Sequence, residues 1–214
     1  MSFSLPNSDC LGFISIEGGD GAGKTTQIEL LTHALERLGK KVKRVRDPGG
    51  TPLGDRLRSL LLDRPIPIDL RAEALLFFAS RAQLVAEQIR PALLRGDLVI
   101  TDRFTLSTVI YQGYAGGLDP AELWRAGTLA TGGIEPSLCF LLDIPPDCAS
   151  GRRDGPTDHM ERKPRDFHDQ VRKGFLAEAK SEARAIHVLD ARESVESLHA
   201  KILERVLTHI GVPR

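Results

Sequence analysis

Five short runs of apolar and β-branched residues alternate with longer segments in which apolar residues recur at helical spacing. The runs begin at Leu11, Lys41, Asp97, Ser137 and Ala185. The segments between them, such as 24–38 and 70–94, are rich in good helix formers. Near-continuous apolar strands that alternate with helices are typical of a parallel sheet covered on both faces. We therefore expect one α/β domain over residues 1–214.

Three of the five runs end in an acidic residue: Asp102, Asp143 and Asp190. The carboxyl ends of parallel strands are where α/β sheets place their ligands. Residues 151–164, GRRDGPTDHMERKP, are dense in charge and interrupted by Gly and Pro. That segment predicts a short flexible lid within the domain.

The amino-acid composition argues against several kinds of partner and site. The chain has 41% hydrophobic and 27% charged residues, the balance of a globular protein. Its 29 basic side chains are matched by 29 acidic ones, which argues against DNA or RNA as a partner. Three cysteines without a CxxC pair predict neither a disulfide framework nor a zinc site. With no secretory signal and no apolar stretch near the ~20 residues that span a bilayer, we expect a cytoplasmic protein without a membrane partner.

One motif directly follows the first predicted strand: GGDGAGKT, residues 18–25, a full match to G-x-x-x-x-G-K-[ST]. Its glycines let backbone N–H groups surround phosphate oxygens, and the following helix N-terminus adds positive charge. Lys24 is expected at the β- and γ-phosphates, and the Thr25 hydroxyl at Mg²⁺. The predicted ATP-binding residues are Gly18, Gly19, Asp20, Gly21, Ala22, Gly23, Lys24, Thr25 and Thr26. Asp20 either takes part in binding Mg²⁺ and the acceptor or only caps the turn.

Candidate residues for an acceptor lie in 46–51 (RDPGGT), 75–81 (LLFFASR) and 102–113 (DRFTLSTVIYQG). Asp102 is placed to hold Mg²⁺, directly or through water. Arg81 and Arg103 are placed to clamp an anion, because a guanidinium matches phosphate oxygens in bidentate geometry. Phe77 lies one helical turn before Arg81, so its ring suits a nucleobase stacked above its own phosphate. The alternatives are a core position for Phe77 and a structural ion pair for Arg103.

These motifs, with FHDQVRKGF at 167–175, resemble the bacterial thymidylate kinases in order and spacing over about residues 13–208. The resemblance implies a three-layer P-loop NTPase fold with a five-stranded parallel sheet, and a homodimer. It also implies Mg²⁺-dependent transfer of a phosphoryl group from ATP to dTMP, which gives dTDP for dTTP synthesis.

The resemblance also implies roles for individual residues. Phe77 would stack on thymine, and Arg81 would reach the base and phosphate. Thr108 and Gln112 would contact the pyrimidine, while Tyr111 would crowd the sugar 2′ position and favour deoxyribose. The substrate-binding residues implied in this way are Asp47, Pro48, Phe77, Arg81, Arg103, Ser107, Thr108, Tyr111 and Gln112.

Two positions depart from the family pattern, Asp47 where the family usually has Glu and His159 where its lid usually has Arg. Arg152 and Arg153 remain the candidate lid arginines, although an ordinary solvated basic pair would look the same. A phosphate acceptor needs no general base, but the approach of two anions needs cations. The predicted catalytic residues are Lys24, Asp20, Asp102, Arg103, Arg152 and Arg153, and the metal ligands are Thr25 and Asp102, with Asp20 as a further candidate.

Two other classes of function stay open on the sequence. One is a kinase for another acceptor, such as dUMP, UMP, dCMP or an alcohol, although an alcohol would not need two phosphate-clamping arginines. The other is a nucleotide-dependent switch or assembly ATPase. A guanine-reading Asn-Lys-x-Asp motif is absent, because the only asparagine is Asn7.

Overall fold

In this computed structural model, residues 11–63, 66–150, 159–181 and 184–212 are described. The strands are β1 (Phe13–Gly18), β2 (Val42–Arg46), β3 (Leu98–Asp102), β4 (Leu138–Asp143) and β5 (Ile186–Asp190). All five runs expected from the sequence are strands. They form one parallel sheet in the order β2-β3-β1-β4-β5, which confirms the expected fold class.

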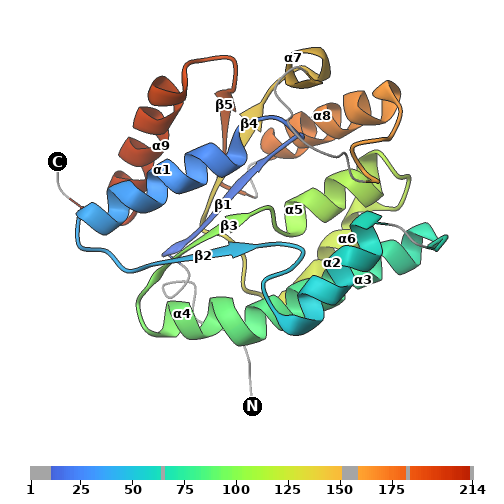
Figure 1. Cartoon of the computed structure of the whole chain (residues 1–214), viewed down its shortest axis with the longest axis horizontal. Coiled ribbons are helices and arrows are strands. Elements are labelled where there is room, and N and C mark those ends of the chain that lie inside the picture. Colours follow the sequence, from blue (N-terminus) through green and yellow to red (C-terminus); the bar gives the residue numbers. More distant parts are fainter. Residues whose placement is uncertain (1–10, 64–65, 151–158, 182–183, 213–214) are drawn as a thin grey trace.

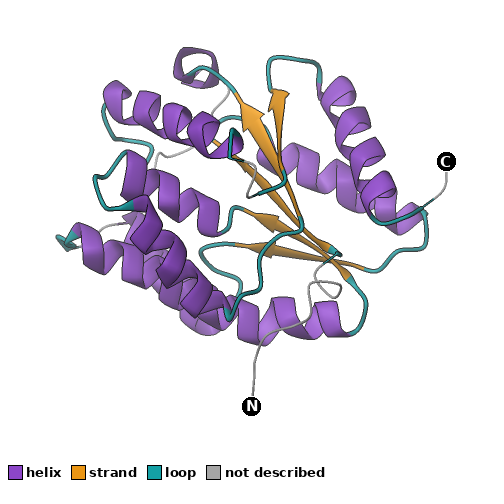
Figure 2. Cartoon of the chain, turned by 180° about the vertical axis from the view of Figure 1, so that it is seen from behind, coloured by secondary structure: helices purple, strands orange, loops and turns teal. Residues whose placement is uncertain are grey.

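Helices cover both faces of this sheet, giving three layers (Figures 1 and 2). The α-helices are α1 (Lys24–Arg37), α2 (Pro52–Asp63), α3 (Leu70–Leu84), α4 (Arg90–Leu94), α5 (Thr105–Thr108), α6 (Pro120–Thr131), α7 (Pro146–Ser150), α8 (Arg165–Ala179) and α9 (Val195–His209). Two π-helical turns are η2 (Val85–Ile89) and η3 (Val109–Tyr114). The long helix expected over 70–94 is present as α3, η2 and α4 in succession.

Alternate residues of the buried strands supply the two cores. Ile14 and Ile16 of β1 point to the face covered by α1 and α9, where they pack with Leu31 and Ile202. Phe13, one position out of phase, points to the opposite face, beneath η2 and α4. Because both faces are covered, the central strands β1, β3 and β4 are buried at almost every position, whereas the edge strands β2 and β5 are only partly buried.

The strand register brings three loops to one edge of the sheet. Ile16 of β1 pairs with Asp102 of β3, and Asp102 pairs with Arg46 of β2. The phosphate-loop motif after β1, the Asp-Arg pair after β3 and the Asp-Pro pair after β2 therefore emerge side by side. This edge lies where the chain crosses between neighbouring strands, which is where α/β sheets bind ligands.

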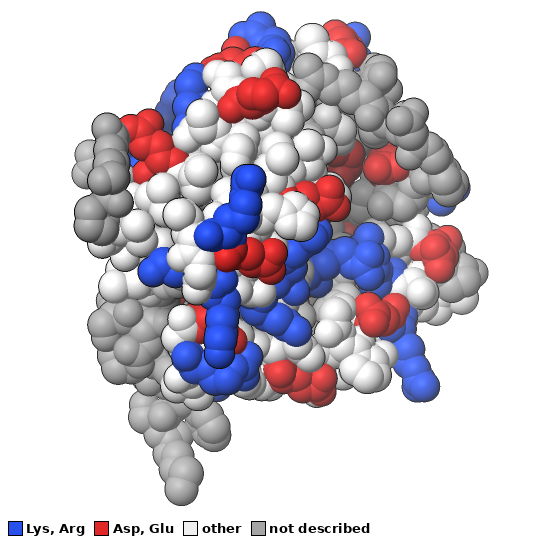
Figure 3. Space-filling model, turned by 60° about the vertical axis from the view of Figure 1, so that its left-hand side comes forward, with Lys and Arg blue, Asp and Glu red and all other residues white. Residues whose placement is uncertain are grey.

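The surface carries both signs of charge. On the face drawn in Figure 3, acidic side chains lie between the basic ones. Among the described residues, no helix is both long enough and apolar enough to cross a membrane.

Candidate active site

The loop between β1 and α1 has the backbone shape that the glycine spacing predicts. Gly21 and Gly23 adopt φ of 78° and 88°, values that favour glycine. A Cβ at Gly18 would lie 2.6 Å from the Leu142 carbonyl oxygen, so this position also requires glycine. α1 begins directly at Lys24, and its first-turn N–H groups face the mouth of the loop as an anion site.

Lys24 is folded over this loop. Its Nζ donates to the carbonyl oxygens of Gly19 at 2.9 Å and Gly18 at 3.3 Å. Burial lowers the pKa of Lys24, and the positive charge of Arg103 lowers it further. Phosphate oxygens arriving at the loop would offer Lys24 negative partners in place of neutral carbonyls.

A cleft of about 860 Å³ opens above the loop and joins it to the predicted acceptor side. From the phosphate loop the cleft is lined by Asp20, Gly21, Gly23, Lys24, Thr25 and Thr26. From the acceptor side it is lined by Asp47, Pro48, Phe77, Arg81, Asp102, Arg103, Ser107, Thr108, Tyr111 and Gln112. Gly18, Gly19 and Ala22 of the same loop do not line it. One cavity thus collects both groups of residues predicted from the sequence.

Asp20 and Arg103 form an ion pair at the centre of the cleft. Arg103 Nη2 lies 2.5 Å from Asp20 Oδ1, and Arg103 Nη1 donates to the Gly18 carbonyl at 2.8 Å. The Tyr111 hydroxyl lies 3.4 Å from the other Asp20 oxygen, beneath the guanidinium. Burial raises the pKa of Asp20, but Arg103 and Lys24 more than offset this, so the pKa lies below its usual value. Asp20 is therefore an ionised partner of the cations and not a proton donor at neutral pH.

Arg81 is the most deeply placed cation that faces the cleft. It is 2% exposed, its Nε donates to Asp47, and its Nη2 donates to the Thr108 hydroxyl at 2.9 Å. Its Nη1 is buried and has no hydrogen-bond partner among the described residues. Such an orphan donor is costly unless a ligand satisfies it. Arg81, which also lines the cleft, therefore has one unsatisfied donor within the described structure.

The acidic partner of Arg81 is the residue that departs from the family pattern. Burial raises the pKa of Asp47, and Arg81 opposes this. The shorter side chain still reaches Arg81, because Asp47 sits directly at the end of β2, facing α3. This departure leaves the ion pair intact.

Phe77 and Gln112 line the same cleft. Phe77 is half-buried, whereas its neighbour Phe78 is 4% exposed and belongs to a core cluster. The core alternative therefore describes Phe78 rather than Phe77. Gln112, on η3, donates from Nε2 to Glu73 at 2.9 Å, which fixes the orientation of its amide.

The residues expected at Mg²⁺ fit that ion. Asp102 Oδ1 is buried with no hydrogen-bond partner among the described residues, and Thr25 is exposed in the cleft on the first turn of α1. No group of three His, Cys, Asp or Glu side chains in the described ranges could bind a metal by itself. Mg²⁺ typically takes one or two protein oxygens and completes its shell with phosphates and water.

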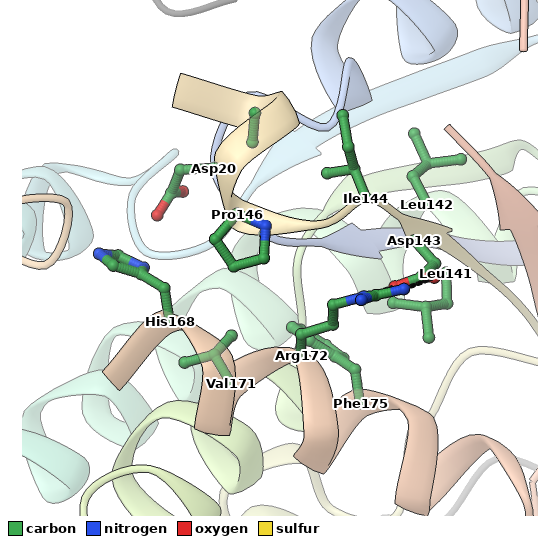
Figure 4. Close-up of a pocket in the computed structure, with 12 residues that line it drawn as sticks. Asp20, Leu141, Leu142, Asp143, Ile144, Pro146, His168, Val171, Arg172 and Phe175 are labelled. Atoms are coloured by element: carbon green, nitrogen blue, oxygen red, sulfur yellow. Dashed lines mark hydrogen bonds and ion pairs between the residues drawn. The ribbon is translucent and has the colours of Figure 1, made fainter. Parts of the chain in front are cut away.

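The other two strand-end acids do not line the cleft. Asp143 forms a two-bond ion pair with Arg172 of α8, at 2.7 and 2.8 Å. Asp190 pairs with Arg192. Figure 4 shows Arg172 against Asp143, and His168 of the same helix facing Asp20, so α8 and the phosphate loop line one pocket.

Several cleft residues were not predicted from the sequence. They are Arg46, Arg58, Leu62, Met160, Glu161, Arg192, Glu193, Ser194 and Val195. Apart from Arg46, the first residue of the segment 46–51, none of them belongs to a candidate motif or acceptor segment, and the fold brings them to the cleft. Met160 and Glu161 belong to the predicted lid, whereas Arg152 and Arg153 lie outside the described residues.

Comparisons with known proteins agree with this geometry. The family model for thymidylate kinase matches residues 16–202. The chain belongs to the thymidylate kinase family. Among curated members, it is 43% identical to the thymidylate kinase of Symbiobacterium thermophilum over 200 residues, covering 91% of this chain and 94% of the relative. It is 44% identical to that of Deinococcus radiodurans over 192 residues, covering 89% and 93%.

The solved structures include a thymidylate kinase from Ehrlichia chaffeensis. It is similar to this chain with a TM-score of 0.75 and 31% identity, covering 91% of this chain and 97% of that one. The matched lengths span both the phosphate loop and the acceptor side. The thymidylate kinase family assignment therefore covers the whole cleft.

Proposed function

We propose that this chain transfers the γ-phosphoryl group of MgATP to the phosphate of dTMP, releasing ADP and dTDP. The observation that carries the proposal is Arg81, a buried guanidinium that lines the same cleft as the phosphate loop and whose Nη1 has no hydrogen-bond partner among the described residues. A switch or ATPase needs the loop but has no need of a second anion site beside it. The family membership supports dTMP as the acceptor.

The donor phosphates would bind at the start of α1. There the loop N–H groups and Lys24 surround the phosphate oxygens, and Lys24 exchanges two carbonyl partners for charged ones. Mg²⁺, held by Asp102 and Thr25, would supply positive charge against the β- and γ-phosphates.

The acceptor phosphate would lie between Arg81 and Arg103. It is itself the nucleophile and is mostly a dianion at neutral pH, because its second pKa is about 6. No base is required, so the task of the residues is to bring two anions together. The ionised Asp20 holds Arg103 at the phosphate loop, between the donor and acceptor ends of the cleft.

The remaining cleft residues would recognise the nucleoside. The half-buried Phe77 offers a ring for stacking on thymine, and Gln112 and Thr108 offer oriented polar groups for the pyrimidine. Tyr111, buried below Arg103, would crowd the 2′ position of the sugar. Arg152 or Arg153 would complete the set of cations when the lid closes.

We also propose that the protein is a homodimer, as the family resemblance implies. Helices α2, α3 and α6 lie side by side (Figure 1). Each carries an exposed leucine, namely Leu53, Leu75 and Leu129, and Leu129 is 85% exposed. Exposed apolar residues on adjacent helices are compatible with an interface. Light scattering of the wild-type protein is expected to give twice the mass of the chain. A Leu129→Glu variant is expected to give the mass of one chain. A wild-type protein with the mass of one chain would reject the proposal.

The kinase activity is tested by coupled ADP release with MgATP and dTMP, dUMP, UMP, dCMP or no acceptor. Turnover that depends on dTMP, well above that with dUMP, is the expected result. Turnover with another acceptor alone would replace dTMP as substrate. Slow hydrolysis that no acceptor stimulates would reject the kinase and favour the switch.

A further inference from the structure

Glu17 is the one charged residue in β1, a strand that is buried at every position. It is the last residue of β1 before Gly18, and its side chain is 0% exposed. Its Oε1 accepts a hydrogen bond from the backbone N–H of Phe104 at 2.7 Å. Its Oε2 accepts one from the Ser107 hydroxyl at 2.5 Å. Both partners belong to the segment that follows β3, 87 and 90 positions further along the chain.

Keeping a carboxylate at this position is costly. Burial raises the pKa of Glu17 to about 7, although Ser107, Arg103 and the Phe104 N–H act in the opposite direction. Burying a carboxylate costs free energy, which its hydrogen bonds can only offset. The stability of the fold alone therefore gives little reason for a carboxylate here.

Both groups that donate hydrogen bonds to Glu17 are close to Arg103. The Phe104 N–H belongs to the peptide group directly after Arg103, and the Ser107 Oγ accepts from Arg103 Nη1 at 3.2 Å. Arg103 has a φ of 66°, the only non-glycine residue with positive φ in the described part of the chain. A side chain in this conformation persists only where its surroundings hold it. Glu17 supplies two of those contacts, one on the backbone and one on the hydroxyl beside the guanidinium.

Glu17 does not itself line the cleft in which the nucleotides are proposed to bind. It is absent from the lining of the cleft, and it lines a separate cavity of about 260 Å³ together with Phe104. Glu135 lines the same second cavity, and its Oε1 accepts from the Thr105 hydroxyl at 3.1 Å. The hydrogen bonds of Glu135 within the described structure go to the hydroxyls of Thr105 and Thr131 and not to Arg103 or Ser107, so it is a matched carboxylate for comparison.

We propose that Glu17 is a positioning residue for phosphoryl transfer, which holds Arg103 in its left-handed conformation and aims the guanidinium into the cleft. This rests on the proposed kinase activity. The effect passes from β1 through Phe104 and Ser107, without contact between Glu17 and either substrate. A single carboxylate thereby fixes the Arg103 segment relative to the phosphate loop, which begins at the next residue.

Glu17→Gln tests the proposal, because it keeps the shape and removes the charge and one acceptor. We expect kcat with dTMP to fall by about 10- to 100-fold, as for other small misplacements of a reacting geometry. The KM for ATP should change little, since Glu17 is outside the cleft. Glu135→Gln should retain the wild-type kcat. Thermal unfolding at pH 8 should show Glu17→Gln at least as stable as wild type, whereas a residue with a purely structural role would lose stability and activity together.

The experiment distinguishes a failure of the proposed kinase activity from a failure of the positioning role of Glu17. Wild-type enzyme without dTMP-dependent ADP release would overturn the proposed function. Active wild type with an equally active Glu17→Gln variant, or an equal loss in Glu135→Gln, would overturn the positioning role. If Glu17→Gln does not fold, Ser107→Ala removes one of the two partners and should lower kcat similarly; a wild-type kcat there would reject the proposal.

Discussion

The buried pair of Arg81 and Asp47 allows folding and substrate binding to be separated. In Arg81→Met the volume is largely kept, but the Asp47 carboxylate remains buried without its partner. Breaking a buried pair in this way costs about 3–5 kcal/mol of unfolding free energy. Replacing both residues, as in Asp47→Asn with Arg81→Met, removes the stranded charge and should recover most of that loss.

Catalysis should not recover with stability. The free Arg81 Nη1 is the group proposed to meet the acceptor. A hydrogen bond to a charged group is worth about 1.5–3 kcal/mol, so its loss should lower kcat/KM for dTMP by about 10- to 150-fold. Both variants should show this loss, while the KM for ATP should stay near that of wild type.

Urea unfolding followed by circular dichroism and steady-state kinetics measure the two effects. A double variant no more stable than Arg81→Met would refute the stranded charge as the source of the instability. Recovery of kcat/KM for dTMP in the double variant would refute the contact between Arg81 and the acceptor.

Three further outcomes are expected. Phe77→Ala should raise the KM for dTMP with little change in stability, whereas Phe78→Ala in the core should cost about 3–5 kcal/mol of unfolding free energy; equal effects of the two on stability would contradict their assignment. The pKa of Glu17 is raised from 4.5 to about 7, so between these pH values the folded state keeps a proton on Glu17 that the unfolded state has lost. The stability gained from that proton is lost as the pH rises through 7. Relative to Glu17→Gln, wild type should therefore lose about 3 kcal/mol between pH 4.5 and 8 by urea titration, and parallel curves would argue against this pKa. Arg153→Ala should lower kcat by ~10³ or more with little change in the KM for ATP, and an unchanged turnover would remove Arg153 from the mechanism.

Much of the fold follows from local signals in the sequence. Each of the five runs is a strand. The central strands β1, β3 and β4 are covered on both faces and are therefore mostly apolar, whereas the edge strands β2 and β5 keep polar positions. The glycine spacing of residues 18–25 fixes the phosphate loop, since Gly21 and Gly23 need positive φ. Phe77 and Arg81 share a helical face by spacing alone, and both line the cleft. These features depend on backbone angles and on periods of two or 3.6 residues, which a short stretch of sequence specifies.

The tertiary structure alone decided which residues meet across the sheet. All three strand-end acids look alike in sequence, yet the strand order turns Asp102 into the cleft and leaves Asp143 and Asp190 paired with arginines. The partner of Arg81 lies 34 positions away, and the partners of Glu17 lie 87 and 90 positions away. Such pairings follow from the order and register of strands, which are set by packing of the whole core. Local sequence therefore predicted the two ends of the site, and the assembled sheet determined how their charges are held together.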